Sequence, residues 1–150
     1  MQKIKFTLVA SCMVLFTGLG TYVRSADMMM KKETISPSAK MQYKEVIPGV
    51  TQAVLWGDPS KGRYGSITKF APGTTHKLHT HTNDVKVVVI SGTFLYKTDE
   101  GEWKLGPGSY LLQPGGKKHI SGTTEEGCSF FQEGSNKFDI NWMDSKPQGK

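Results

Sequence analysis

Cysteine is scarce in this chain of 150 residues, which holds only Cys12 and Cys128. Cys12 lies in an N-terminal segment that we expect to be removed, so the remaining chain could form no internal disulfide. Cys128 lies in the apolar run Cys128-Ser129-Phe130-Phe131, where we expect a buried, inert thiol. The sequence also contains no CxxC pair, no phosphate-binding loop and no Ser-His-Asp order, and so offers none of the chemistry that those motifs serve.

A basic patch is also missing, although the chain is basic overall. Its 19 Lys and Arg side chains against 13 Asp and Glu side chains give a net charge of +6. Without Lys3, Lys5 and Arg24 the balance becomes 16 against 13, or +3. The remaining lysines are scattered among acidic residues, whereas a nucleic-acid-binding protein gathers them in a patch or stripe. We therefore expect no nucleic-acid partner.

No apolar run is long enough to span a bilayer comfortably. Residues 6–19 are apolar apart from small or weakly polar interruptions, a short basic start precedes them, and small residues follow near Ser25 and Ala26. This order is typical of a secretory signal peptide. We predict cleavage near Ser25–Ala26, which makes the protein periplasmic or secreted and leaves no stable membrane span. An uncleaved N-terminal anchor is the alternative; lipid attachment at Cys12 is disfavoured because the apolar run continues past it.

A helical period of three or four is absent from the rest of the chain. Short runs rich in β-branched and aromatic residues alternate with Gly, Pro, Asn and Asp, and the 17 glycines suit this density of turns. The expected strands are residues 52–56, 64–70, 76–81, 85–90, 93–97, 110–113, 119–123 and 128–132. The pattern predicts a single all-β domain, a sandwich or barrel, at residues 43–140. A signal peptide at 1–25 and a flexible leader at 26–42 precede it, and a tail at 141–150 follows.

All four histidines lie in the middle of this domain, at His76, His79, His81 and His119. Side chains two positions apart on a strand face the same way, so His79 and His81 can bend onto one metal ion. His119 would supply a third ligand from another strand. His76 is an odd number of positions from His79, so we expect it to face away, at the surface or rim.

The spacing around these histidines resembles the two motifs of the cupin family. Gly73 precedes His79 by five intervening residues, and His81 and Gly92 follow; Gly108, Pro114, Gly116 and His119 fall at the offsets of the second motif. The resemblance implies an antiparallel jelly-roll β-barrel that holds a divalent metal at His79, His81 and His119. Imidazole discriminates poorly between metals, so Fe(II) or Zn is expected, with Mn, Ni and Cu as alternatives.

Further stretches, among them Leu55-Trp56-Gly57-Asp58-Pro59 and Gln113-Pro114-Gly115-Gly116, are similar to a group of small, largely uncharacterised bacterial cupins. This is the RmlC-like, ChrR-like group, some of whose relatives form the metal-binding part of anti-sigma factors. The three-histidine set also resembles the cupins that cleave diketones with ferrous iron and oxygen. A fold and a metal follow from these likenesses more readily than a function does.

One departure from the cupin pattern affects the metal site. Cupins usually supply a glutamate ligand shortly after the second histidine, at positions occupied here by Val85 and Lys86. Asp84 lies one residue earlier, beside Asn83, and can either reach the metal or cap a turn; we favour the turn. The sequence thus predicts a three-histidine site with open coordination positions.

Tyr96 and Glu133 are the candidates for catalytic work beside the ion. The Tyr96 hydroxyl can donate to a bound oxyanion, although a packed core tyrosine explains it equally well. Glu133 is a candidate for the missing carboxylate, supplied from another strand. For Gln113, which ends an expected strand, an amide bonded to the backbone is the favoured role.

Three functional hypotheses remain. The protein binds a small oxygenated molecule at its metal as an enzyme, foremost a non-heme metal dioxygenase; or it is a non-catalytic periplasmic metal-binding, ligand-binding or sensor module. The third hypothesis, a cupin that has lost its metal, conflicts with the retention of three histidines. Because cupins commonly dimerise through their sheets, we also expect a homodimer, with residues 52–56 as a candidate contact.

Overall fold

A computed structural model describes residues 33–143, so the expected signal peptide, residues 26–32 of the leader and the chain after residue 143 lie outside it. The chain divides into Met1–Thr34 and Ile35–Lys150, and all described elements lie in the second unit. They are the 3-10 helix η1 (Ser38–Lys40) and the strands β1 (Lys44–Ile47), β2 (Val50–Gly57), β3 (Tyr64–Phe70), β4 (His79–Thr80), β5 (Val85–Thr98), β6 (Gly101–Leu105), β7 (Tyr110–Gln113), β8 (Ile120–Gly134) and β9 (Asn141–Trp142). Within residues 33–143, no helix has the length and apolar character needed to cross a membrane.

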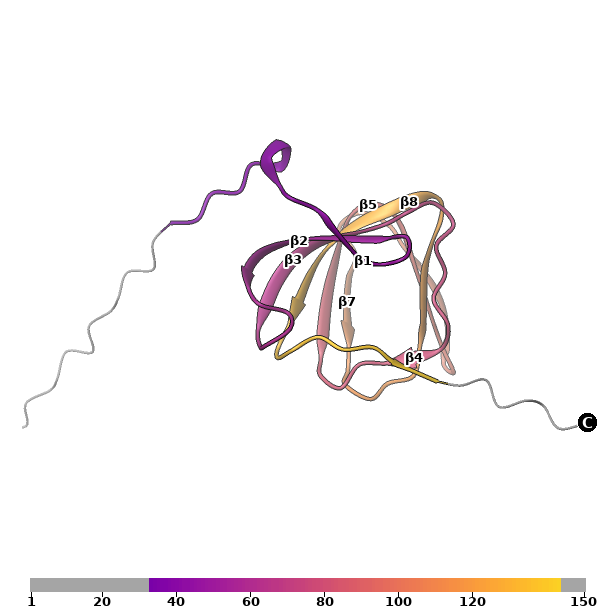
Figure 1. Cartoon of the computed structure of the whole chain (residues 1–150). Helices are drawn as coiled ribbons and strands as arrows, with labels where there is room; N and C mark the ends of the chain where they lie inside the picture. The colour runs from indigo at the N-terminus through magenta and orange to yellow at the C-terminus, as the bar shows by residue number, and fades with distance from the viewer. Residues whose placement is uncertain (1–32, 144–150) are drawn as a thin grey trace, which may run out of the picture. The chain divides into compact units, whose positions relative to one another are not determined.

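The strands form an antiparallel barrel, which Figure 1 shows from the side. Six strands of the main sheet follow the order β1-β2-β3-β8-β5-β6, and β7 pairs with β5 beside this path. A small second sheet joins β4 to β9, and single bridges join Thr75 to Gly122 and His79 to His119. These bridges attach the segment around β4 to the start of β8. The predicted antiparallel jelly-roll barrel in a single domain is confirmed.

Two long strands, β5 and β8, run side by side and each bends partway along its length. Each contains a glycine with positive φ, Gly92 at 69° and Gly127 at 72°. A Cβ on Gly92 would lie 2.0 Å from the carbonyl oxygen of Gly127, so only glycine allows the strands to approach this closely. The register shifts between Val89 and Ser91 and again between Gly92 and Phe94, as in a β-bulge. Gly92 therefore bends a continuous strand, where the sequence suggested a turn between two strands.

Strand alternation decides which side chains fill the barrel. Val85, Val87 and Val89 of β5 are buried, while the residues between them are exposed. Aromatic rings from β3, β5 and β8 add to this core: Phe70, Phe94 and Phe130 lie 5.0–5.6 Å apart between ring centroids. Cys128 joins the same cluster at 6% exposure, and burial raises the pKa of its thiol, as expected of an inert cysteine.

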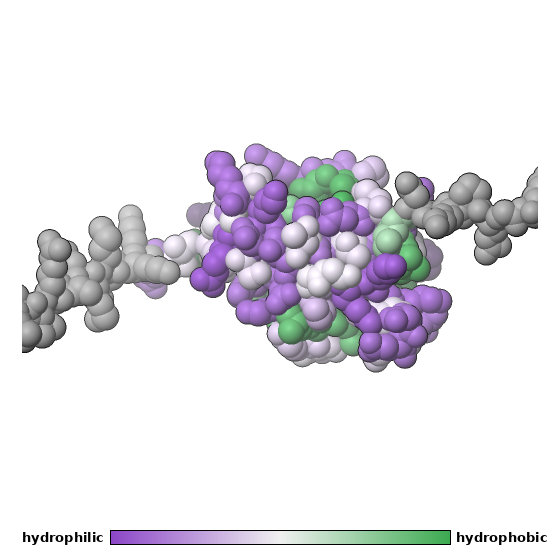
Figure 2. Space-filling model, turned by 90° about the horizontal axis from the view of Figure 1, so that it is seen from below, coloured by the Kyte–Doolittle hydropathy of each residue, from purple (hydrophilic) through white to green (hydrophobic). Residues whose placement is uncertain are grey.

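The outer surface is mixed in character. In the face that Figure 2 shows, hydrophilic side chains cover most of the surface and apolar ones gather in separate places. The exposed large apolar residues of the described chain include Val54 and Trp56 on β2, Val88 and Ile90 on β5, and Tyr110 and Leu112 on β7.

Candidate metal centre

Three of the four histidines meet inside the barrel. His79 begins β4, His81 follows that strand, and His119 directly precedes β8. The main chains of His79 and His119 exchange two hydrogen bonds of 3.0 Å, which fixes the two imidazoles side by side. All three side chains are buried, and one ligand atom from each lies within 4.8 Å of the other two. The structure thus brings together the three residues that the sequence proposed as metal ligands.

Each of these imidazoles has its Nδ1 bonded to a main-chain carbonyl oxygen. The acceptors are Lys77 for His79 at 2.7 Å, Asp139 for His81 at 2.6 Å and Lys117 for His119 at 2.9 Å. A carbonyl oxygen can only accept, so each Nδ1 carries the proton and each Nε2 keeps a lone pair. This arrangement orients and polarises histidine ligands in metal sites.

Burial keeps the cluster in its metal-binding protonation state. It lowers the pKa of His79 and of His119 to about 4, and the charges of neighbouring histidines lower the pKa of each ring further toward that value. Burial also lowers the pKa of His81, against the opposing effect of its hydrogen bond to Asp139. At pH 7 the rings are therefore neutral, as metal coordination requires.

The donor set fits a divalent transition metal. Three neutral nitrogen ligands with oriented lone pairs match the preferences of Zn, Fe and the other imidazole-binding metals. Such ligands leave the ion its double charge, so it would polarise an oxygen-bearing ligand or lower the pKa of bound water. The three histidines would hold the ion through their Nε2 atoms.

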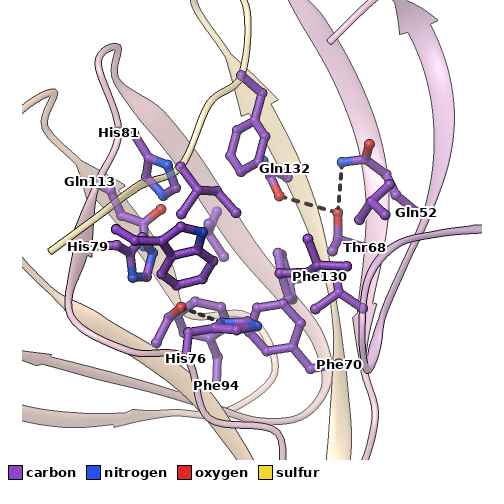
Figure 3. A pocket seen from close by; sticks show the side chains of 18 residues that line it. Gln52, Thr68, Phe70, His76, His79, His81, Phe94, Gln113, Phe130 and Gln132 are labelled. Carbon is purple, nitrogen blue, oxygen red and sulfur yellow. Dashed lines mark hydrogen bonds between the residues drawn. The ribbon is translucent and has the colours of Figure 1, made fainter. Parts of the chain in front are cut away.

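A cavity of about 330 Å³ adjoins the cluster (Figure 3). Figure 3 shows His79, His81 and Gln113 on one side of it and Gln52, Thr68 and Gln132 on the other, with phenylalanine rings between. No Asp, Glu, Lys or Arg among the described residues lines the cavity. Its size is at the lower end of the range of small-molecule sites, and its apolar walls with a few polar groups are typical of them.

The polar groups far from the histidines bond mainly to one another. Gln52 donates through Nε2 to Ser66 at 3.0 Å and to Thr68 at 3.3 Å, and Thr68 donates to Gln132 Oε1 at 3.3 Å. Gln132 in turn donates to the hydroxyl of the fully buried Tyr64. These contacts fix a neutral polar wall opposite the metal ligands.

The segment from Phe138 to Trp142 closes one side of the cavity, a role that no sequence pattern predicted. Phe138, Ile140 and Trp142 line the cavity, and β9 pairs with β4, so that Trp142 lies opposite His79. The main-chain oxygen of Asp139 accepts from His81. Asn141 and Trp142 belong to the part that the sequence assigned to the tail, and only the three-dimensional pairing shows their contact with the site.

Strand parity predicted that His76 faces away from the other histidines, at the surface or rim. The structure places it on the cavity wall instead. It lines the cavity, its ring centroid lies 6.1 Å from that of His79, and its Nδ1 is 3.1 Å from the Ser121 hydroxyl. The parity argument failed because β4 begins only at His79, and a bend at Leu78 separates it from the bridge at Thr75, so alternation is not continuous from His76 to His79.

Asp84 and Glu133 lie away from the histidine cluster. Asp84 is exposed, and its carboxylate accepts from the main-chain N–H of Gly115 at 2.8 Å, so it caps the turn before His119, whereas the sequence predicted that it caps its own turn beside Asn83. Glu133 alternates with the inward-facing Gln132 and forms an ion pair with Lys86 at 3.2 Å. It does not line the cavity, so strand alternation removes it as the missing carboxylate.

Tyr96 and Gln113 both contact His119. The Tyr96 ring packs against the imidazole at 5.2 Å between centroids, and burial raises the pKa of its phenol. It does not line the cavity, which matches the interpretation as a packed core tyrosine. The Gln113 amide nitrogen is 3.4 Å from His119 Nε2, inside the site, where the sequence had suggested a bond to the backbone.

Comparisons with known proteins agree with this architecture. A family model described as the ChrR Cupin-like domain matches residues 30–136. No curated protein matches the chain.

Solved structures share the fold at low sequence identity. The polyketide cyclase RemF from Streptomyces resistomycificus is 17% identical, with a TM-score of 0.64 over 77% of this chain and 89% of that one. An RmlC-like cupin from Shewanella frigidimarina NCIMB 400 is also 17% identical, with a TM-score of 0.59 over 69% and 90%. A cupin-like protein of unknown function from Ralstonia eutropha JMP134 is 25% identical, with a TM-score of 0.59 over 74% and 78%. These likenesses concern the fold.

Proposed function

The chain belongs to the ChrR cupin-like domain family, and from this membership and its three converging imidazoles we propose that it is an exported metal-binding protein. It holds one divalent ion at His79, His81 and His119 and binds a small oxygenated ligand in the adjoining cavity. The observation that carries the proposal is the common state of the three rings: each Nδ1–H is bonded to a main-chain carbonyl, so each Nε2 is unprotonated and has a lone pair that a metal can take.

We assign Fe(II) or Zn to the site, with Mn, Ni and Cu as metals that the same ligands accept. The three rings fill only part of a coordination sphere, because Asp84 caps a turn and Val85 stands where cupins usually have a glutamate. Open positions facing a cavity suit an oxygen-bearing ligand. The absence of charged residues from the described lining favours a ligand that is neutral apart from the group that meets the ion.

The enzymatic form of this proposal is a non-heme metal dioxygenase acting on such a ligand. The second candidate is a non-catalytic periplasmic metal-binding or sensor module, which the absence of any carboxylate from the described cavity lining favours. Oxygen uptake by the ferrous protein with acetylacetone separates the two candidates. Consumption above that of His79→Ala supports the dioxygenase; equal consumption with retained metal supports the module.

Elemental analysis of the protein purified from the periplasm tests the metal proposal. We expect about one divalent ion per chain, and its loss in His79→Ala, His81→Ala and His119→Ala, because removing a ligand costs more than the 10–100-fold typical of an outer contact. His76→Ala, the control histidine, should keep the ion. A wild-type protein that stays metal-free after reconstitution with zinc and with ferrous iron would overturn the proposal.

Export and self-association complete the proposal. The order of basic, apolar and small residues over the first 25 or so positions supports export, and intact mass of the periplasmic protein should begin near Ala26 or Asp27. The exposed Val54 and Trp56 of β2 support a homodimer through this strand. Trp56→Arg should then reduce the mass measured by light scattering to that of a monomer, whereas Lys69→Glu on β3 should not.

A further inference from the structure

His76 has a buried nitrogen that no described group satisfies. Its Nδ1 is 3.1 Å from the Ser121 hydroxyl, whereas its Nε2 has no hydrogen-bond partner among the described residues. Buried polar atoms are rarely left without partners, and each exception calls for an explanation such as a catalytic role or a bound water or ion. Because His76 lines the cavity, a bound ligand can supply the partner.

The position of His76 differs from that of the three candidate metal ligands. Those rings bond their Nδ1 atoms to main-chain oxygens, while His76 faces a hydroxyl and lies outside the cluster of convergent ligand atoms. Its ring stands edge-on to Phe70 at 4.8 Å and 6.1 Å from His79, measured between centroids. It is therefore held beside the metal centre by an aromatic wall and one polar contact.

The partner hydroxyl lets the imidazole take either tautomer. Ser121 can donate to Nδ1, which leaves Nε2 as a proton donor, or accept from Nδ1–H, which leaves Nε2 as an acceptor. A main-chain carbonyl would allow only one of these states. When Ser121 accepts from Nδ1–H, the Nε2 of His76 keeps a lone pair that no described group occupies.

We propose that His76 is a proton-transfer residue for a carbonyl ligand bound in the cavity, with Ser121 as its positioning residue. The inference rests on the proposed function and adds to it a general base and a substrate class. The cavity offers aromatic walls and no charged side chain among its described lining residues, so the substrate class is an uncharged, largely apolar carbonyl compound.

The proposed step is a reversible proton transfer that needs no co-reactant. His76 Nε2 removes a proton from the carbon next to the carbonyl, that C–H bond breaks, and its electron pair moves onto the carbonyl oxygen. As the imidazole becomes a cation, its Nδ1–H donates to the Ser121 oxygen. Return of a proton to the same carbon, as the electron pair moves back from the oxygen, regenerates the ligand, so that in D₂O the original proton is replaced by a deuteron. General acid–base groups of this kind contribute about 10²–10⁴-fold to rate.

Proton exchange of a defined probe tests the inference. The probe is 2-hydroxyacetophenone in D₂O with the zinc-loaded protein, and the signal is the loss of its methylene protons by ¹H NMR. We expect wild type to accelerate this loss, His76→Ala to reduce the acceleration by about 100-fold or more, and Ser121→Ala to reduce it by about 10-fold. Ser91→Ala, a serine whose exposed hydroxyl contacts Ser129 outside the cavity, should match wild type.

A second measurement does not depend on turnover. In metal-free protein, the side-chain ¹⁵N resonances of His76 should shift when 2-hydroxyacetophenone is added, and those resonances should be absent in His76→Ala.

Equal proton exchange in wild type and His76→Ala, with one zinc bound to each, would overturn the inference and leave the metal proposal intact. Loss of zinc in His76→Ala comparable to that in His79→Ala would also overturn it, because His76 would then be a ligand. A wild-type protein that binds no metal overturns the proposed function instead, while an unshifted His76 resonance in that protein removes the inference as well.

Discussion

The Nδ1–H of His81 donates to the main-chain oxygen of Asp139 at 2.6 Å, across 58 positions of sequence. The same Asp139 holds Thr82 through its carboxylate, with contacts of 2.8 Å to the main-chain N–H and 2.6 Å to the hydroxyl. A candidate metal ligand is thus oriented by the segment that closes the cavity, and metal binding and cavity closure depend on one short stretch of chain.

Asp139→Ala should weaken metal binding although Asp139 is not among the candidate ligands. Loss of its carboxylate releases Thr82 and loosens the carbonyl that orients His81, so we expect zinc affinity to fall by about 10-fold, the lower end for contacts behind a ligand. Competition with a chromogenic zinc chelator measures this. Glu102→Ala, which removes an exposed carboxylate paired with Lys97, is the matched control and should bind zinc as wild type does.

Trp142 should report on the metal by fluorescence. Its ring centroid lies 5.2 Å from that of His79 and it lines the cavity, whereas Trp56 on β2 and Trp103 on β6 do not line it. Copper or cobalt in the site should quench Trp142, and Trp142→Phe should remove most of the metal-dependent change, while Trp56→Phe retains it. The opposite pattern would mean that the ion binds elsewhere.

The sequence predicted individual strands well where a short run of β-forming residues is bounded by turn residues on both sides. Residues 64–70 and 110–113 were predicted as strands and are β3 and β7 to the residue. Two pairs of predicted strands proved to be the single strands β5 and β8, because Gly92 and Gly127 bend each strand without ending it. A glycine in a bulge and a glycine in a turn look alike in sequence.

The site was predictable only as far as motif spacing reaches. The three clustered histidines fall at fixed offsets, but the contact of His81 with Asp139 and the pairing of β9 with β4 join distant segments that no local pattern connects. The strands β1 and β6 were missed as well, and parity misplaced His76 because it applies only within a strand. These errors share one cause, which is that tertiary pairing overrides local sequence preference.

Acid should destabilise the metal-free protein in a defined window. His79 and His119 have a pKa of about 4 in the folded protein against an ordinary value of 6.5, so between these values the unfolded chain binds more protons. Their contribution to stability is present above about pH 6.5 and is lost as the pH falls to about 4, by at most about 3 kcal/mol for each histidine.

Thermal unfolding followed by circular dichroism in EDTA at pH 7.5, 5.5 and 4.5 measures this loss. His79→Gln, which cannot titrate, should show a smaller fall in Tm across the window than wild type. An equal fall in both proteins would assign the acid sensitivity to other groups. With zinc present, the histidines should release the ion over the same range, because protons compete for the Nε2 lone pairs.

Restoring a carboxylate at Val85 should strengthen the metal site. Val85 is 3% exposed and pairs with Gln113, whose amide lies 3.4 Å from His119 Nε2, so a glutamate here points toward the three imidazoles. We expect Val85→Glu to raise zinc affinity by about 10-fold or more, since a charged ligand is added to three neutral ones. The metal-free variant should be less stable than wild type, because a buried carboxyl without its ion is unfavourable.

Asp84→Asn keeps an oxygen that can accept from Gly115 and should leave zinc affinity nearly unchanged. Zinc titrations of the two variants, with unfolding of each in EDTA, decide between an open three-histidine site and a site with Asp84 as fourth ligand. Unchanged affinity in Val85→Glu beside a collapse in Asp84→Asn would show that Asp84 coordinates the ion and that the site is not open.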